Sequence, residues 1–153
     1  MAKAERNSPT KKRKSGIPTG NAGEYAVMAE LLARGFDAQL ADRNTKGYDL
    51  LVGMANLEHM KKVQVKTVRA APWYVRQIDF KEPAVSQITV YVLLGKEDRS
   101  TAFRYFITKN SDLVSHVIVP NPNWKTTGFM GLSSIQSYEE NWLLFNRELK
   151  KRT

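Results

Sequence analysis

Three polar residues between positions 47 and 67 have types and spacing that suit chemistry on a phosphate ester. Asp49 opens an apolar segment, and Gln64 and Lys66 alternate with valines in a second one, within the run GYDLLVGMANLEHMKKVQVKT. Side chains two apart on a strand share a face, so Gln64 and Lys66 are expected together, opposite the valines. We expect the two segments to pair as a hairpin that brings Asp49 beside them on one exposed sheet face.

These groups would suit divalent-metal phosphodiester cleavage. A carboxylate and an amide oxygen are ligands for a hard cation, and a lysine beside them can act on water and counter phosphate charge. Each residue also has a structural explanation, because Asp49 could be a turn residue and Lys66 a solvated strand residue. Two other acid-x-Lys runs compete: Asp79-Phe80-Lys81, which could share a strand face, and Glu148-Leu149-Lys150, whose helical pattern separates the two side chains.

The composition limits which metal ligands are available. With 153 residues and 42% apolar content, the chain supports one domain with a core. It has no cysteine and only two histidines, which excludes disulfides and thiolate sites and argues against a His-rich zinc site. No apolar run approaches the roughly 20 residues that span a bilayer, and no secretory signal pattern is visible. We therefore expect a cytoplasmic protein without membrane contact, with oxygen ligands for any metal.

The net charge of +9 is concentrated at the two ends of the chain. Residues 1–15 have six basic side chains against one acid, and residues 150–152 add three more, which leaves +1 for residues 16–149. Basic arms of this kind contact a polyanion, so DNA is the expected partner. Solubility alone could also explain them, and KKRK could act as a nuclear import signal. The candidate DNA-binding residues in the arm are Lys11, Lys12, Arg13 and Lys14.

Apolar periodicity and turn residues predict a helix, then five strands, then two helices. We expect a disordered basic arm over 1–19, a single domain over 20–149 and a basic tail over 150–153. The first predicted element is a helix over 21–34. Five strands follow: one over 36–41, one that begins at 49, one that ends at 67, one over 87–94 inside the sheet, and one over 102–108. The C-terminal part is predicted to hold a short helix over 111–117, a loop over 121–131 and a helix opened by a capping box at Ser137. This order predicts an α/β or α+β fold with a mixed central sheet flanked by helices.

An aromatic and basic cluster over residues 70–82 follows the second site segment without a clear period. Trp73 could stack on bases in a DNA groove, although packing in the core is the more common use of such a residue. Arg43, Lys46 and Arg69 are further candidates for DNA contact. A solvated surface explains these three residues nearly as well.

Short motifs in a fixed order resemble the PD-(D/E)XK nuclease superfamily, whose core is restriction-endonuclease-like. They are GxxGE in the first helix, ELLARGF at its end, then KGYDLLV and VQVKT, and the resemblance covers roughly residues 20–110. It is greatest to small bacterial nuclease-like proteins and Holliday-junction resolvase-type members. The order and strand context of the motifs carry the resemblance, because each motif is short.

The resemblance implies a site residue by residue. Asp49 matches the aspartate that binds Mg²⁺ (or Mn²⁺), Lys66 matches the motif lysine, and Glu24 matches a helix glutamate near the metal. Gln64 stands where a second acid usually lies, and the backbone carbonyl of Val65 would be a further ligand. Two departures from the motif are Tyr48 in place of proline and Gln64 itself, since a neutral amide offers a weaker oxygen and no charge.

The expected function is that of a Mg²⁺-dependent DNA endonuclease, with Glu24, Asp49, Gln64 and Lys66 as catalytic residues. Cutting both strands would need a second copy, so a homodimer is expected. Restriction, repair, junction resolution and intron homing all remain open. The alternative is a catalytically inactive DNA-binding or protein-interaction module on the same fold, with Gln64 marking lost metal affinity. A third possibility, an RNA-binding or ribosome-associated basic protein, would leave the polar strand face unexplained.

Overall fold

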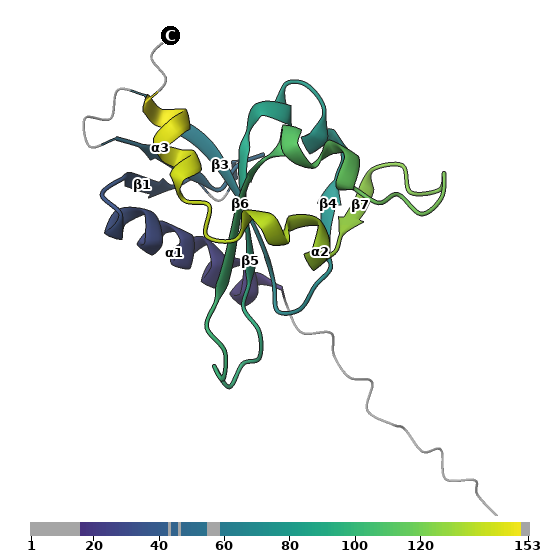
Figure 1. Ribbon diagram of the computed structural model, residues 1–153, viewed down its shortest axis with the longest axis horizontal. Helices are drawn as coiled ribbons and strands as arrows, with labels where there is room; N and C mark the ends of the chain where they lie inside the picture. Colours follow the sequence, from purple (N-terminus) through teal and green to yellow (C-terminus); the bar gives the residue numbers. More distant parts are fainter. Residues whose placement is uncertain (1–15, 43, 46, 55–58, 151–153) are drawn as a thin grey trace, which may run out of the picture.

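The computed structural model describes residues 16–42, 44–45, 47–54 and 59–150, and is built around a mixed five-stranded sheet (Figure 1). The sheet order is β1-β2-β3-β5-β6, in which β3 and β5 are parallel and the other neighbours are antiparallel. The strands are β1 Asp37–Leu40, β2 Leu50–Gly53, β3 Lys61–Val68, β5 Ile88–Leu93 and β6 Arg104–Lys109. The predicted α+β fold with a mixed sheet is confirmed, as are the β2–β3 hairpin and the interior place of β5.

Each face of the sheet has its own hydrophobic core, because side chains alternate along the strands. Val63 and Val65 of β3 pack in a cluster with residues of α1 (Ile17–Ala33) and α3 (Leu143–Lys150). On the opposite face, Tyr91 and Phe106 pack with residues of a second, two-stranded sheet and of short helices. These elements are β4 Trp73–Arg76, β7 Thr127–Met130, η1 Gln77–Phe80, η3 Asn110–His116, α2 Leu132–Ile135 and η4 Gln136–Tyr138. A further short helix, η2 Ala84–Ser86, precedes β5. Figure 1 shows α1 and α3 on one side and β4, β7 and α2 on the other.

Helix α1 begins at Ile17, four residues before the predicted start. Pro18 lies in the first turn, where its missing N–H is not needed and its fixed φ suits the helix, so α1 can begin before it. Gly35 ends the helix with a φ of +88°, as predicted. The expected disordered arm over 1–19 is therefore too long at its end, since residues 17–19 are helical, and residues 1–15 lie outside the described part.

Two sequence-based expectations in the C-terminal half are wrong. The predicted loop over 121–131 contains β7, which pairs antiparallel with β4 in the segment that showed no period. The predicted capping box at Ser137 does not open a helix, because Ser137 lies in η4 and α3 begins at Leu143. Glu140 instead takes a φ of +58° and accepts a hydrogen bond from Trp142 Nε1 at 2.6 Å.

In the described part of the chain, no helix combines the length and apolar character needed to cross a membrane.

Candidate active site

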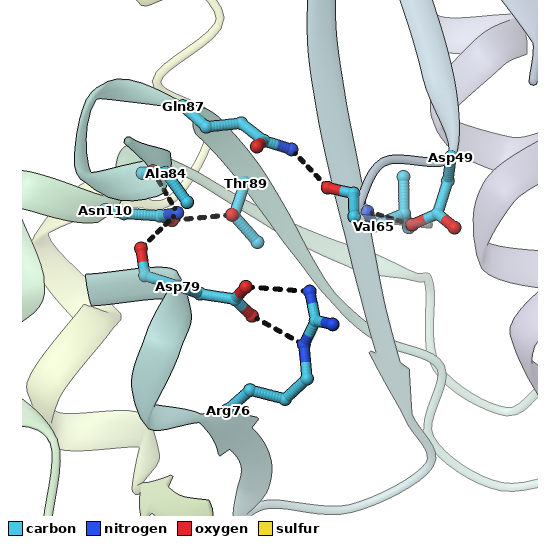
Figure 2. A network of polar contacts seen from close by, with 9 residues as sticks. Asp49, Val65, Arg76, Asp79, Ala84, Gln87, Thr89 and Asn110 are labelled. Atoms are coloured by element: carbon cyan, nitrogen blue, oxygen red, sulfur yellow. Dashed lines mark hydrogen bonds and ion pairs between the residues drawn. The ribbon is translucent and has the colours of Figure 1, made fainter. Parts of the chain in front are cut away.

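Asp49 lies where β2 meets β3, and its carboxylate completes the hydrogen bonding of β3. The Asp49 amide donates to Val63 O at 2.9 Å, and the Val65 amide donates to Asp49 Oδ2 at 2.8 Å (Figure 2). The N–H and C=O of one strand residue point to the same side of the strand, so the Val65 carbonyl faces the side where the Asp49 carboxylate lies. This side of β3, which runs past the start of β2 at Leu50, is called the β3 edge. Continuing the β2–β3 register by one residue from the Leu50–Val63 pair places Asp49 opposite Gln64.

Glu24 reaches the same place from α1. A close approach of helix and strand permits this, since a Cβ built on the preceding Gly23 would lie 1.7 Å from Thr67 Oγ1 of β3. Burial and the neighbouring Asp49 raise the pKa of Glu24, and a hydrogen bond between the two side chains adds to the rise. Glu24 and Asp49 both line one pocket and raise each other's cost of ionisation, because two negative charges side by side repel.

Gln64 and Lys66 project from the face of β3 opposite Val63 and Val65, as the alternation predicts. This face is not exposed, however, because β4 and η1 belong to the layer that covers it. Gln64 is only 8% exposed, and Lys66 is half-buried. Burial lowers the pKa of Lys66, and a nearby Arg76 acts in the same direction, while Asp79 and Asp49 oppose the shift. Lys66 therefore lies within electrostatic reach of Asp49 on one side and of an Arg76–Asp79 pair on the other.

A pocket of about 370 Å³ opens beside the two carboxyl groups. Its lining includes Glu24 and Asp49 together with Tyr48, which stands where the motif has proline. The Lys62 ammonium lies 5.1 Å from the centre of the Tyr48 ring. Gln64 and Lys66 are not among the residues that line this pocket. The remaining lining residues are Ile17, Asn21, Tyr25, Leu40, Ala41, Asp42 and Thr45.

Gln87 holds the loop before Asp49, a role that the sequence analysis missed. Its Nε2 donates to Gly47 O at 2.7 Å, forty positions away (Figure 2). The main-chain carbonyl of Gln87 accepts from the main-chain N–H of Asn110 at 2.9 Å, which links Gln87 to η3. Gly47 has a φ of +89°, a conformation that favours glycine. A glutamine just before the most strand-like segment of the chain carries no pattern that would have identified this contact.

Trp73 is buried, so its ring is not available to stack on bases as the DNA-binding prediction required. It is 1% exposed, packs edge-on against Tyr91 and Phe106, and donates from Nε1 to Val92 O at 3.3 Å. The alternative of core packing is correct, because β4 turns alternate residues inward. Arg69 is exposed, and its Nη1 donates to Gly95 O at 3.1 Å. The other predicted DNA-binding residues lie outside the described residues: Lys11, Lys12, Arg13, Lys14, Arg43 and Lys46.

The donor set at the β3 edge fits a hard divalent cation. Within the described ranges, no three acidic or histidine side chains form a metal-binding group, so the only charged donors that meet here are Glu24 and Asp49. The Gln64 amide and the Val65 carbonyl would supply neutral oxygens. Oxygen donors are those that Mg²⁺ and Mn²⁺ prefer, and a cation between the two carboxylates would relieve their repulsion.

The chain has a nuclease-like fold. No family model matches it, and no curated protein sequence matches it. Among solved structures, it is similar to the bacterial homing endonuclease I-Ssp6803I, with a TM-score of 0.54 and 14% identity over 90% of this chain and 95% of that one. It is also similar to Hjc, a Holliday junction resolvase of Archaeoglobus fulgidus, with a TM-score of 0.46 and 16% identity over 77% and 88% of the two chains. The fold-level resemblance expected from the motifs is confirmed.

Proposed function

We propose that the protein is a metal-dependent DNA endonuclease that hydrolyses phosphodiester bonds. The observation that carries the proposal is that Glu24 of α1 and Asp49 line one pocket beside β3, where the Asp49 carboxylate also accepts from the Val65 amide. Gln64 and Lys66 follow on the same strand, so that oxygen donors and a cation are gathered within a few residues of one strand. The nuclease-like fold supports the proposal without deciding the chemistry.

Glu24, Asp49, Gln64 and the Val65 carbonyl would hold Mg²⁺ or Mn²⁺. When bound, such a cation makes water more acidic and neutralises charge on a phosphate. Asp49 is oriented for this task by its bond to the Val65 amide, and Gln87 fixes the loop before it. Lys66 would orient the attacking water and attract the scissile phosphate. The half-buried surroundings of Lys66 strengthen its charge interactions relative to open solvent.

Grip on DNA would come from basic residues outside this cluster. We propose that phosphates are contacted by the N-terminal residues Lys11, Lys12, Arg13 and Lys14, and by Arg43, Lys46 and Arg69. These contacts would supply affinity without reading the base sequence. Cleavage of both strands is proposed to require a homodimer, in which each copy cuts one strand.

A second function is supported by Gln64. A neutral amide in place of the usual second acid weakens a hard-cation site, and a chain without metal binding could remain as a DNA-binding or protein-interaction module. This relic would keep the fold, the basic arm and the packing of β3. It would have no metal-dependent activity.

Cleavage of plasmid and branched DNA with Mg²⁺ or Mn²⁺ separates the two functions. The enzyme is expected to nick or cut, Asp49→Ala to abolish cleavage, and Lys66→Ala to reduce turnover while most DNA binding remains. Arg104→Gln on β6 is the matched control, since it removes one cation away from the β3 edge and should leave cleavage unchanged. Wild type and Asp49→Ala that bind DNA equally and leave every substrate intact would exclude the enzyme and favour the relic.

A further inference from the structure

A buried acid near the candidate site holds an exposed arginine in a fixed position. Asp79 of η1 is 6% exposed, and its carboxylate accepts from Arg76 Nη2 at 2.7 Å and from Arg76 Nε at 3.2 Å. The Asp79 main-chain carbonyl accepts from Asn110 Nδ2 at 2.9 Å, and Asn110 Oδ1 accepts from Thr89 Oγ1 at 2.7 Å. Figure 2 shows this network, which ties Asp79 to η3 and β5. Asp79 and Lys81 therefore do not share a strand face, as the competing motif required.

This ion pair leaves part of the guanidinium available to a ligand. A guanidinium has five N–H groups, and Asp79 accepts from two of them. The Arg76 side chain is 45% exposed, whereas that of Asp79 is 8% exposed. A two-point bond to a buried carboxylate fixes the plane of the guanidinium, so that little side-chain freedom remains to be given up when a ligand binds.

Arg76 also lies close to the candidate site. Strand β4 contacts β3, and Arg76 and Asp79 are both charge neighbours of Lys66. In Figure 2 the guanidinium lies between Asp79 and the strand that carries Val65. Two cations, Lys66 and Arg76, are thus placed on the covered face of β3, next to the edge where the acid pair lies.

We propose that Arg76 is a second phosphate-binding residue of this site and that Asp79 is its positioning residue. The inference rests on the proposed function. The ligand of Arg76 is a backbone phosphate of duplex DNA, next to the phosphate that Lys66 attracts. The exposed part of a guanidinium can offer two parallel N–H groups to phosphate oxygens, a geometry that lysine lacks. The alternative is that the Arg76–Asp79 ion pair only links β4 to η1 and binds no ligand.

The test compares two double variants that leave the net charge unchanged. Arg76→Gln with Asp79→Asn removes the cation without leaving a buried carboxylate unpaired. Arg104→Gln with Glu139→Gln is the matched control, because that pair is also two-pronged, at 2.8 Å and 2.8 Å, but lies at edge strand β6. Binding of duplex DNA without divalent metal is measured over a range of salt concentrations, with circular dichroism as the check on folding.

The first double variant is expected to weaken binding and to reduce the slope of log K against log salt by about 0.9, the value for one neutralised phosphate. The control pair should keep the wild-type slope. A wild-type slope in the folded Arg76→Gln/Asp79→Asn protein, or an equal change in both variants, would overturn the proposal. Absence of DNA binding by the wild type would overturn it as well.

Arg76→Lys covers the case in which the double variant does not fold. It retains the positive charge beside Asp79 and removes the parallel N–H donors of the guanidinium. DNA binding should therefore weaken roughly tenfold, while the slope of log K against log salt stays unchanged. Binding equal to wild type would overturn the proposal. The binding assay contains no divalent metal, so its outcome is independent of the cleavage assay. A reduced salt slope in the double variant, together with no cleavage by the wild type in Mg²⁺ or Mn²⁺, would support the role of Arg76 and reject the endonuclease. Cleavage by the wild type together with an unchanged salt slope in the double variant would support the endonuclease and reject the role of Arg76.

Discussion

Gly23→Ala should separate α1 from β3 and disturb the acid pair that the helix completes. A Cβ at this position would lie 1.7 Å from Thr67 Oγ1 and 2.7 Å from Thr67 Cβ, and contacts below 3.0 Å essentially never occur. Rotation of the Thr67 side chain can move Oγ1 away but not Cβ, so helix and strand must also move apart by about 0.3 Å or more. Overpacking of this kind costs about 1–3 kcal/mol. Glu24 follows Gly23 directly, so separation of the helix from the strand would disturb the position of its carboxyl group relative to Asp49.

The matched control is Gly20→Ala in the same helix, where a Cβ would meet nothing within 4 Å. Both substitutions gain about 0.8–1.0 kcal/mol of helix propensity, so the difference between them isolates the clash. Thermal unfolding should place the Gly23→Ala midpoint about 2–12 °C below that of Gly20→Ala, given roughly 2–4 °C per kcal/mol for a chain of this size. Thr67→Ala should recover part of the stability, because it removes the atom in closest approach. Equal midpoints for the two alanine variants would refute the close approach.

Three further predictions concern the site and the arm. The raised pKa of Glu24 means that its ionisation costs stability as pH rises above the ordinary value of 4.5, so Glu24→Gln should raise the unfolding midpoint of the metal-free protein by a few degrees at pH 7 and change little at pH 4. An equal change at both pH values would contradict the repulsion. Gln87→Ala should lower cleavage about three- to tenfold through the loop at Gly47 and leave the salt slope of DNA binding unchanged, whereas the exposed Gln136→Ala should do neither. Deletion of residues 1–15 should weaken DNA binding and reduce its salt slope by about 0.9 for each phosphate that the arm neutralises in the wild type, and an unchanged slope would show that the arm does not touch phosphate.

Local patterns were sufficient to predict the half of the fold that positions the site. The alternation of Val63, Gln64, Val65 and Lys66 predicts the two faces of β3, and the polar connection after β2 predicts the hairpin. The burial of the polar face was not predictable in this way. It depends on β4, whose residue Trp73 pairs with Met130, 57 positions further along the chain.

The errors at the C-terminal end share a physical cause, which is that tertiary contacts override local signals. The segment TGFM of β7 has two residues with no strand preference, and only its pairing with β4 makes it a strand. The Ser137–Glu140 spacing fits a capping box, but Glu140 bonds Trp142 and its amide donates to Tyr105 O. Asp79 was considered only as a motif acid, because its pairing with Arg76 depends on the 3-10 turn between them.

The central claim is that the β3 edge holds a divalent cation, because an active endonuclease and a DNA-binding relic share everything else. Calorimetric titration of Mn²⁺ into the metal-free protein measures this directly. We expect saturable binding by the wild type that is abolished in Asp49→Ala, weakened in Gln64→Ala and strengthened in Gln64→Glu, since a carboxylate is the better ligand for a hard cation. Absence of binding by the wild type, or equal binding by wild type and Asp49→Ala, would contradict the account.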